Sequence, residues 1–262
     1  MNPSHRTREK NKSFPPKVFL ERALSKMGYC SRSQARLLIQ SGKVYVNARL
    51  IKNPEHPIVF QQDQITVKGD SLKTQEKVYL LLNKPHGFVT TTSDEHGKKT
   101  VYDCLKTFAG ETPLPWVFPV GRLDKASEGV LLFSNDTQWA NKITDPESHL
   151  DKTYHVQINC LPSENLLNQM KNGVNYESEI LRVKEVNCLR YGQKNSWLKI
   201  ILEEGKNRHI RRLLEDLDIQ VLRLIRVAIG PLELGNLPKG QYRFLTLQEH
   251  RSLVTKKDSE QA

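Results

Sequence analysis

Apolar side chains recur at helical spacing in two adjacent segments near the start of the chain. VFLERALSKMG, residues 18–28, places apolar residues three or four positions apart, and Gly28 can end that helix in a left-handed conformation. RSQARLLIQSG, residues 32–42, repeats the spacing, and Ser31 before it is suited to an N-cap. The pattern therefore predicts two short helices in succession.

Strand-like alternation follows these helices. KVYVNARLI, residues 43–51, alternates apolar and polar positions about a central turn, and QITVKG, residues 64–69, supplies a further strand. The polar segment after it has the low apolar content of a linker. We therefore expect a small unit of two helices and a small sheet over residues 17–69, joined by a linker at residues 70–77 to the rest of the chain.

The remainder of the chain, residues 78–250, alternates between strands and helices. Strands outnumber helices in it, and several strands follow one another directly. This order predicts an α+β fold built on a mixed, largely antiparallel sheet. The segments expected as strands are VYLLLNKP, VFPV, VLLF, KTYHVQI, ILRVKEVNCL, SWLKIILEE, LRLIRVAIG and QYRFLTL, and those expected as helices are TVYDCLKTF, TQWANKIT, SENLLNQMKNG and NRHIRRLLEDL.

Length and composition fit an ordinary globular protein. The chain has 262 residues, of which 37% are hydrophobic and 26% charged, and it can hold a small domain joined to a larger one. No apolar run approaches the roughly 20 residues that would span a bilayer. The basic amino terminus lacks the apolar segment of a signal peptide. We therefore expect a cytoplasmic protein with no membrane attachment, a disordered basic tail at residues 1–16 and a C-terminal tail at residues 251–262.

The positive charge is concentrated at the amino-terminal end. Of a net +11, residues 1–16 carry +3 and residues 17–69 carry +6. Concentrated positive charge attracts polyanions because binding releases their counterions. A solvated basic surface or a contact with anionic lipid is the alternative, but the folded pattern of residues 17–69 favours a nucleic-acid-binding unit.

The usual signatures of cofactor and metal chemistry are missing from the sequence. The four cysteines lie far apart with no Cys-x-x-Cys pair, so buried reduced thiols are the simpler interpretation. The chain has no Gly-x-Gly-x-x-Gly, no Gly-x-x-x-x-Gly-Lys-Ser/Thr and no His-Glu-x-x-His motif. We therefore expect any catalysis to use neither a metal nor an organic cofactor.

VGRLDKASEG, residues 120–129, places Arg-Leu-Asp between two glycines and directly before an apolar strand. Gly121 and Gly129 allow the backbone a sharp, exposed excursion in which Asp124 stands. Taken alone, an aspartate in such a place is more often a turn residue than a reactive group. Two further segments favour the reactive interpretation.

Those segments supply an aromatic ring and a basic helix start. Tyr154, in KTYHVQI, can stack on an unpaired base, although alone it is more often a core tyrosine. In EEGKNRHIRRLLEDL, residues 203–217, Asn207 can cap a helix that has one apolar and one basic face. Cations at a helix start oppose its dipole, so a bound phosphate or a buried carboxylate explains them better than solvent. These cations are Lys206, Arg208, Arg211 and Arg212.

The segment LERALSKMGYCSRSQARLLIQSGKVYVNARLI resembles the alpha-L, or S4-type, RNA-binding motif. In that family the second helix and the turn before the strand contact structured RNA through its shape and phosphates. The resemblance implies Arg32, Arg36 and Lys43 as RNA contacts. Their side chains are suited to phosphate contact rather than to reading bases.

The segments VGRLDKASEGVLLFSND, DKTYHVQI and EEGKNRHIRRLLEDL, in this order, resemble the bacterial ribosomal-RNA pseudouridine synthases of the RsuA and RluB group. The likeness also takes in LLNKPHGFVTT and RLIRVAIGPLELGNLPKGQYRFLT and covers about residues 17–250. It implies a pseudouridine synthase catalytic domain at residues 78–250. Two departures are Ser127, where the group usually has Thr, and His209, where many members have Gln.

The resemblance also implies residue roles. Asp124 would start the isomerisation of uridine, in which the bond from ribose to uracil N1 breaks, the base turns and the bond re-forms through C5. Arg211 would pair with Asp124, and Tyr154 would pack on the target base. Arg122 would fill the gap left by the flipped-out uridine. Extruding the base costs a few kcal/mol, which stacking and phosphate contacts recover.

The implied substrate is ribosomal RNA, with the large subunit favoured over the small and tRNA third, and no protein partner beyond a monomer is expected. One alternative is a nucleoside glycosylase or glycoside hydrolase, which also acts at an anomeric carbon. Such enzymes need two carboxylates, and Glu128 is the only nearby candidate in sequence for the second. The other alternative is an RNA-binding assembly factor with an inert catalytic domain.

Overall fold

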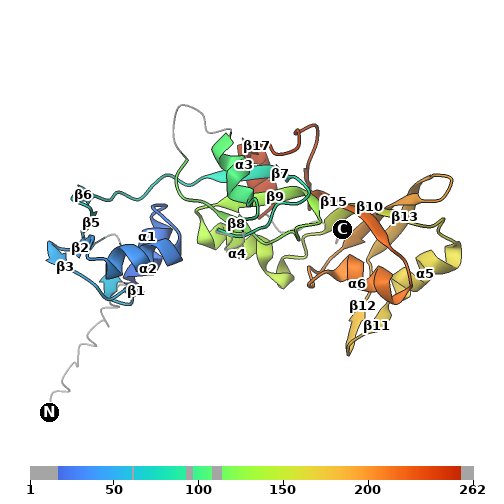
Figure 1. The fold of residues 1–262 in the computed structure, drawn as a ribbon, viewed down its shortest axis with the longest axis horizontal. Coiled ribbons are helices and arrows are strands. Elements are labelled where there is room, and N and C mark those ends of the chain that lie inside the picture. Colours follow the sequence, from blue (N-terminus) through green and yellow to red (C-terminus); the bar gives the residue numbers. More distant parts are fainter. Residues whose placement is uncertain (1–16, 61, 93–96, 108–113, 255–262) are drawn as a thin grey trace, which may run out of the picture. The chain divides into compact units, whose positions relative to one another are not determined.

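The computed structural model describes residues 17–60, 62–92, 97–107 and 114–254. The chain divides into two units, residues 1–75 and 76–262, each with its own hydrophobic core (Figure 1). The basic tail expected at residues 1–16 lies outside the described residues, as do residues 255–262 of the expected C-terminal tail. No helix in the described part of the chain has the length and apolar character needed to cross a membrane.

The amino-terminal unit contains the two expected helices. Ser31 caps the second one, because its hydroxyl accepts from the Gln34 backbone at 3.2 Å while the Gln34 side chain accepts from the Ser31 backbone. Gly28 follows the first helix with φ +75°, as expected for a left-handed cap. The elements are β1 (Lys17–Phe19), α1 (Leu20–Lys26), α2 (Arg32–Gln40), β2 (Val44–Val46), β3 (Arg49–Leu50), β4 (Pro57–Val59), β5 (Ile65–Val67) and β6 (Asp70–Ser71).

Two boundaries in this unit differ from the prediction. The first helix starts at Leu20 rather than at residue 18, because Lys17–Phe19 pair with β4 as a strand. The expected linker at residues 70–77 begins inside the fold, since β6 is the edge strand of the sheet β3-β2-β5-β6. In both cases backbone pairing with a distant segment decides a conformation that the local pattern does not show.

The larger unit is organised around one sheet, whose described part has the strand order β13-β14-β10-β15-β9-β7-β17, with β8 on β9 and β16 on β15. The pair β9–β15 is parallel and the other pairings are antiparallel, so the predicted mixed, largely antiparallel sheet is confirmed. Its strands are β7 (Tyr79–Lys84), β8 (Phe118–Val120), β9 (Glu128–Ser134), β10 (Lys152–Ile158), β13 (Glu185–Tyr191), β14 (Ser196–Leu202), β15 (Val221–Ile229), β16 (Leu232–Glu233) and β17 (Tyr242–Phe244).

Helices cover both faces of this sheet. Side chains of α3, α5 and α6 join the core on one face, and side chains from α4, with Leu253 just after α7, join the core on the other. Strands β7 and β9 therefore bury alternate residues on opposite faces, which explains their unbroken apolar runs. The helices are α3 (Val101–Thr107), α4 (Thr137–Thr144), the 3-10 turn η1 (Pro146–Ser148), α5 (Glu164–Asn172), α6 (His209–Asp216) and α7 (Leu247–Ser252).

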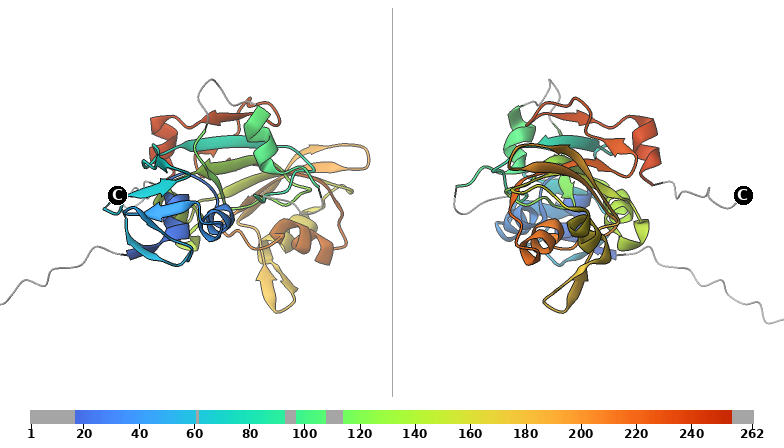
Figure 2. Two further views of the ribbon diagram at one scale, coloured as in Figure 1. Left: turned by 60° about the vertical axis from the view of Figure 1, so that its left-hand side comes forward. Right: turned by 90° about the vertical axis from the view of Figure 1, so that its right-hand side faces the viewer.

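Two further expectations need correction. The segment ILRVKEVNCL, expected as one strand, is divided between β12 (Glu179–Leu181) and β13, and β12 pairs only with β11 (Val174–Tyr176) in a hairpin that projects from the larger unit (Figure 2). The C-terminal tail expected from residue 251 starts later, because α7 runs to Ser252 and Leu253 is buried in the core.

Candidate active site

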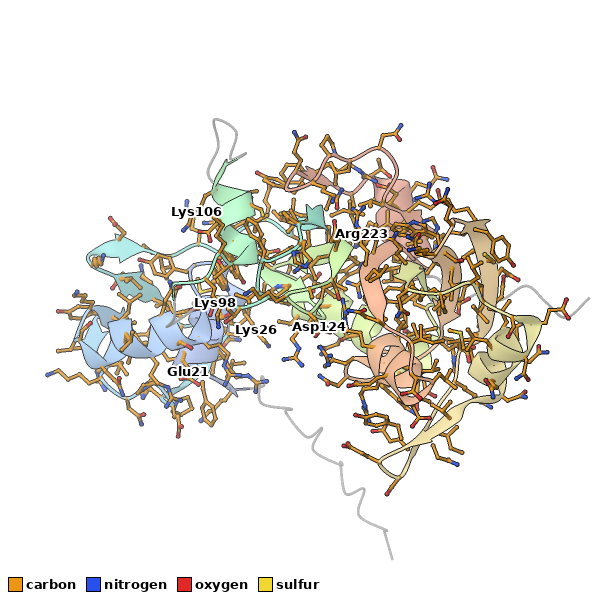
Figure 3. All side chains as sticks on the ribbon, turned by 45° about the vertical axis from the view of Figure 1, so that its right-hand side comes forward. Glu21, Lys26, Lys98, Lys106, Asp124 and Arg223 are labelled. Carbon is orange, nitrogen blue, oxygen red and sulfur yellow. The ribbon has the colours of Figure 1, made fainter. Side chains whose placement is uncertain are left out.

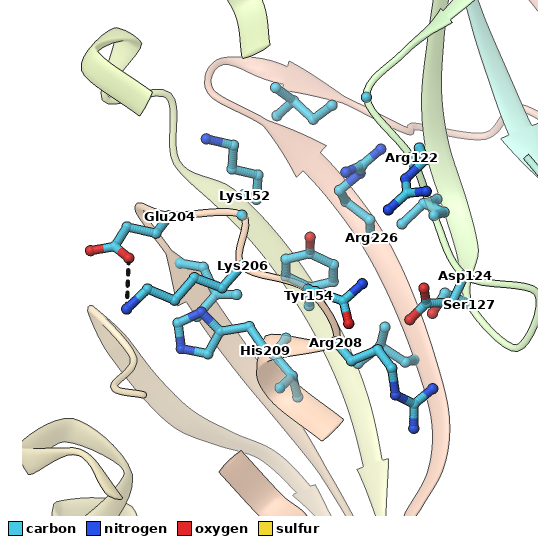
Figure 4. Close-up of a pocket in the computed structure, with 18 of the residues that line it drawn as sticks. Arg122, Asp124, Ser127, Lys152, Tyr154, Glu204, Lys206, Arg208, His209 and Arg226 are labelled. Atoms are coloured by element: carbon cyan, nitrogen blue, oxygen red, sulfur yellow. Dashed lines mark ion pairs between the residues drawn. The ribbon is translucent and has the colours of Figure 1, made fainter. Parts of the chain in front are cut away.

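A pocket of about 560 Å³ opens in the larger unit where three distant segments meet. Its wall includes the loop between β8 and β9, strand β10 and the start of α6. It thus brings together Asp124, Tyr154 and Arg211, which the sequence places in separate motifs. Figure 4 shows Tyr154 in the middle of the labelled residues, with Asp124 and Arg226 on one side and Lys206 and His209 on the other.

Asp124 stands in a tight loop at the edge of this pocket. The chain leaves β8 through Gly121, whose φ of +79° favours glycine, and the Ser127 backbone N–H donates to the Asp124 carbonyl at 3.0 Å. Asp124 is therefore a turn residue, and it also presents its carboxylate to the pocket. Asp124 is therefore compatible with both interpretations, that of a turn residue and that of an exposed functional group.

Lys84 holds this loop from inside the protein. It is the last residue of β7 and is 0% exposed. Its ammonium donates to the carbonyls of Ser127 at 2.7 Å, Asp124 at 3.0 Å and Pro85 at 3.2 Å. Burial lowers the pKa of Lys84 to about 8, although the nearby charge of Asp124 partly opposes the shift.

Lys84 was missed as a site residue by the sequence interpretation. It appeared only as part of the strand VYLLLNKP and of the segment LLNKPHGFVTT. The available signal was a lysine that ends a fully buried strand, because a buried ammonium needs several acceptors. Carbonyls within a regular sheet are already paired with strand neighbours, so the acceptors have to come from a turn. A buried lysine at the end of a strand therefore indicates a turn packed against it.

Gly129 fixes the far end of the loop against β15. A Cβ at this position would lie 2.1 Å from the Arg226 carbonyl oxygen, and its φ is +98°. Only glycine lets β9 approach β15 this closely, at the parallel pair Gly129 and Arg226. The glycine thus sets the distance between the Asp124 loop and strand β15.

Tyr154 reaches the pocket from β10. The ring is 9% exposed, and its backbone pairs with Ile200 on one side and Arg226 on the other. The side chain belongs to the larger hydrophobic core and also lines the pocket. Both interpretations made from the sequence, a core tyrosine and a platform for a base, are compatible with this position.

Arg211 binds the Asp124 loop through a different residue from the one that the resemblance implies. Its Nη2 donates to the Ala126 carbonyl at 2.9 Å. Among the described residues Asp124 forms no ion pair within 4.0 Å, yet its charge acts on Arg211. Burial and the neighbouring Arg208 lower the pKa of Arg211, and Asp124 opposes that shift. Arg211 thus positions the loop and supplies positive charge near Asp124.

The start of α6 differs from the prediction in two respects. The N-cap is Arg208, in a left-handed conformation with φ +48°, and not Asn207. Arg212 does not share the pocket face, because its guanidinium lies 4.6 Å from the Tyr176 ring centroid and 3.7 Å from the Glu179 carboxylate. The expected basic face therefore divides, with Lys206, Arg208 and Arg211 at the pocket and Arg212 against the β11–β12 hairpin.

Two other residues named from the sequence line the same pocket. Arg122 extends from the Asp124 loop toward Arg226 (Figure 4). His209 is buried, and its pKa is lowered first by burial and then by the charge of Lys206. The imidazole is therefore neutral at pH 7, which favours a packing or contact role over that of an acid.

The basic residues of the amino-terminal unit form a separate group. Glu21, buried on α1 (Figure 3), accepts from Arg32 at 3.2 Å and from Arg36 at 2.9 Å. Hydrogen bonds from Arg36 lower the pKa of Glu21, against the effect of burial. Both arginines keep half or more of their side-chain surface in solvent, so Glu21 orients them without covering them. Lys43 is exposed, directly before β2.

Glu128 is unsuited to be a second catalytic carboxylate. Its side chain is buried and accepts from Arg223 at 2.6 and 3.0 Å, with Lys239 as a further partner. Burial would raise the pKa of Glu128, but these cations lower it to about 2. A carboxylate that is permanently ionised and enclosed cannot act as the general acid of a glycosidase.

Comparisons with known proteins agree on one family. A family model described as RNA pseudouridylate synthase matches residues 78–216, and an S4 domain model matches residues 20–65. An "Uncharacterized RNA pseudouridine synthase" of Aquifex aeolicus is 34% identical over 88% of this chain and 92% of its own length. "Ribosomal large subunit pseudouridine synthase B" of Bacillus subtilis is 32% identical over 89% and 94%. A crystal structure of a pseudouridylate synthase is 30% identical, with a TM-score of 0.61, over 90% of this chain and 100% of that one.

Proposed function

The chain belongs to the RNA pseudouridylate synthase family, and on that premise we propose that it isomerises one uridine of ribosomal RNA, by preference in the large subunit. The S4 domain match indicates RNA as the partner of the amino-terminal unit. The Bacillus subtilis relative, named for the large ribosomal subunit, favours that RNA over the small-subunit RNA and over tRNA.

The single observation that carries the mechanism is the position of Asp124 in the loop held by Lys84 at the pocket that Tyr154 lines. A uridine extruded from its stack enters this pocket with its base against Tyr154. Asp124 then assists the breaking of the bond between ribose C1′ and uracil N1. The base turns, C5 bonds to C1′, and the proton on C5 is finally transferred to N1, so the product has the composition of the substrate.

Asp124 needs a fixed position to act in this way. Arg211 and Lys84 hold its loop by donating to the carbonyls of Ala126 and Asp124, and they place two positive charges around it. Tyr154 lines the pocket, and its hydroxyl is suited to assist removal of the C5 proton from a base that packs on the ring. Arg122, Lys206 and Arg208 provide positive charge around the opening for the neighbouring phosphates.

Modification mapping tests this function directly. Purified protein is incubated with unmodified ribosomal RNA, and carbodiimide adducts that survive alkali are located by primer extension. We expect one new stop, in large-subunit RNA, and the same stop should disappear from RNA of cells that lack the protein. Release of free uracil would indicate a glycosylase, and an unchanged map with intact binding would indicate a non-catalytic assembly factor.

Removal of residues 1–75 tests the role of the amino-terminal unit. Because Arg32, Arg36 and Lys43 are suited to phosphate contacts, we expect RNA affinity to fall at least about tenfold at 0.15 M salt. The slope of log K against log salt should become shallower by about 2 to 3. Filter binding at several salt concentrations measures both the affinity and the slope. The control is Lys142→Gln, at an exposed position on α4, which should change the slope by no more than about 1. An unchanged slope after truncation contradicts the assignment.

A further inference from the structure

Arg226 is a buried guanidinium at the pocket with donors left over. It lies on β15 opposite Tyr154 and is 7% exposed. Its Nε donates to the Val130 carbonyl at 2.8 Å, while its Nη2 is buried and, among the described residues, has no hydrogen-bond partner. Arg226 also lines the pocket, so its guanidinium lies beside the space that a ligand would enter.

A second cation, Lys152, lies near Arg226. Lys152 is on β10, two residues from Tyr154, and its Nζ donates to the Glu203 carbonyl at 3.1 Å. Burial lowers the pKa of Lys152, and the charge of Arg226 lowers it further. In Figure 4 both lie on the side of the Tyr154 ring toward which its hydroxyl points, with Arg122 beside Arg226 and Lys152 across from them.

Carboxylates compensate this group of cations only in part, since Asp151 and Glu203 act on Lys152 without forming an ion pair with it. Within the described part of the chain, Arg226, Lys152 and Arg122 form no ion pair within 4.0 Å. Of the three acidic residues on the pocket wall, Glu203 pairs with Lys184 at 3.4 Å and Glu204 with Lys206 at 3.1 Å. The charge of the third, Asp124, acts on Lys84 and Arg211. Of these three cations Arg226 alone is fully buried, whereas Lys152 is half-buried and Arg122 is exposed. Burying a charge without a partner is costly, so an anion that enters the pocket would stabilise Arg226.

We propose that Arg226 and Lys152 form a subsite for the phosphodiester group next to the flipped-out uridine, which deepens the function proposed above. A guanidinium with free Nη donors matches two phosphate oxygens, and an ammonium adds charge from a second direction. A neutral uracil carbonyl would accept one hydrogen bond but would leave the buried charge of Arg226 uncompensated. The phosphodiester of RNA supplies both the acceptors and the charge.

The reaction requires the ribose to be held in place while the base turns, and a phosphate subsite would do this. Between cleavage at N1 and bonding at C5 the base is not attached to the ribose, so base and sugar have to be held separately. Arg226 and Tyr154 occupy paired positions on adjacent strands, which places the phosphate subsite beside the base platform. The phosphate contact keeps C1′ in place while the base turns against Tyr154, which preserves the alignment that fast rebonding needs.

Nucleotide titrations test the subsite without any requirement for catalysis. The full-length protein is titrated with uridine and with uridine 3′,5′-bisphosphate, and binding is followed by NMR. We expect the bisphosphate to bind at least about tenfold more tightly, equal to about 1.4 kcal/mol. Arg226→Gln and Lys152→Gln should each remove most of that preference, and Arg226→Lys should restore part of it. Arg190→Gln, which removes an exposed arginine from β13, should retain the full preference.

The outcomes separate this proposal from the proposed function. If Arg226→Gln and Lys152→Gln both fold and still prefer the bisphosphate as the wild type does, the subsite is wrong, whether or not the protein modifies RNA. If Arg226→Gln weakens uridine and bisphosphate equally, the contact is with the base and the proposal is also wrong. If the wild type modifies no RNA but shows the phosphate preference, the proposed function fails and the subsite stands.

Discussion

Asp124→Asn is expected to reduce pseudouridine formation by at least about 10³-fold while RNA affinity stays within about threefold of the wild type. Asparagine keeps the shape of the side chain and the backbone turn with Ser127, so the loop held by Lys84 remains in place. What is lost is the negative charge and the ability to act as a nucleophile or base at the ribose. Single-turnover assays with saturating protein, together with filter binding, measure the two quantities separately.

Asp216→Asn is the matched control for this experiment. Asp216 is exposed at the end of α6 and does not line the pocket, so the same chemical change there should leave activity within about twofold, as is usual for surface substitutions. If Asp124→Asn modified RNA at the native rate, Asp124 would not be the catalytic group. If it lost RNA binding together with activity, the residue would position RNA rather than react with it.

The periodicity of the sequence was sufficient to predict most elements of the larger unit. The half-buried strands β10 and β14 alternate, β7 and β9 each contain an unbroken apolar run, and α6 has a clear apolar face. These patterns are local consequences of burial, so they can be read without a structure. The strand β1 and the strand β6 have no such signal, because two or three residues become strands only through a distant partner.

Within the site, the sequence predicted which segments meet but not how their side chains divide. Spacing placed Arg208, Arg211 and Arg212 together on a helix face, but the left-handed Arg208 lies before the helix and the β11–β12 hairpin draws Arg212 away. Neither effect is visible in spacing. Lys84 was missed because its role depends on carbonyls that a turn forty residues away presents to it.

Lys84→Met is expected to lower the rate of pseudouridine formation by about 10²-fold, since a misplacement of about 1 Å in a reacting group costs on that order. Methionine fills the buried space but donates no hydrogen bond to the carbonyls of Asp124 and Ser127. The loop then loses its internal support, and Asp124 loses a nearby positive charge. Lys142→Met, at an exposed site on α4 outside the pocket, is the control and should retain wild-type activity.

The pH dependence distinguishes this role from a general packing defect. With its pKa lowered to about 8, Lys84 loses its charge as the pH rises through 8, so wild-type activity should fall there. The residual activity of Lys84→Met should show no such fall.

The free energy of unfolding changes with pH in the opposite direction to the activity. Between pH 8 and the ordinary lysine pKa of 10.5 the unfolded chain binds the proton more tightly than the folded protein, so deprotonation favours the folded state. The free energy of unfolding of the wild type should therefore increase relative to that of Lys84→Met from pH 7 to pH 10, measured by urea denaturation. A constant difference across that range would show that the fold does not lower the pKa of Lys84, and would contradict the expected loss of its charge near pH 8.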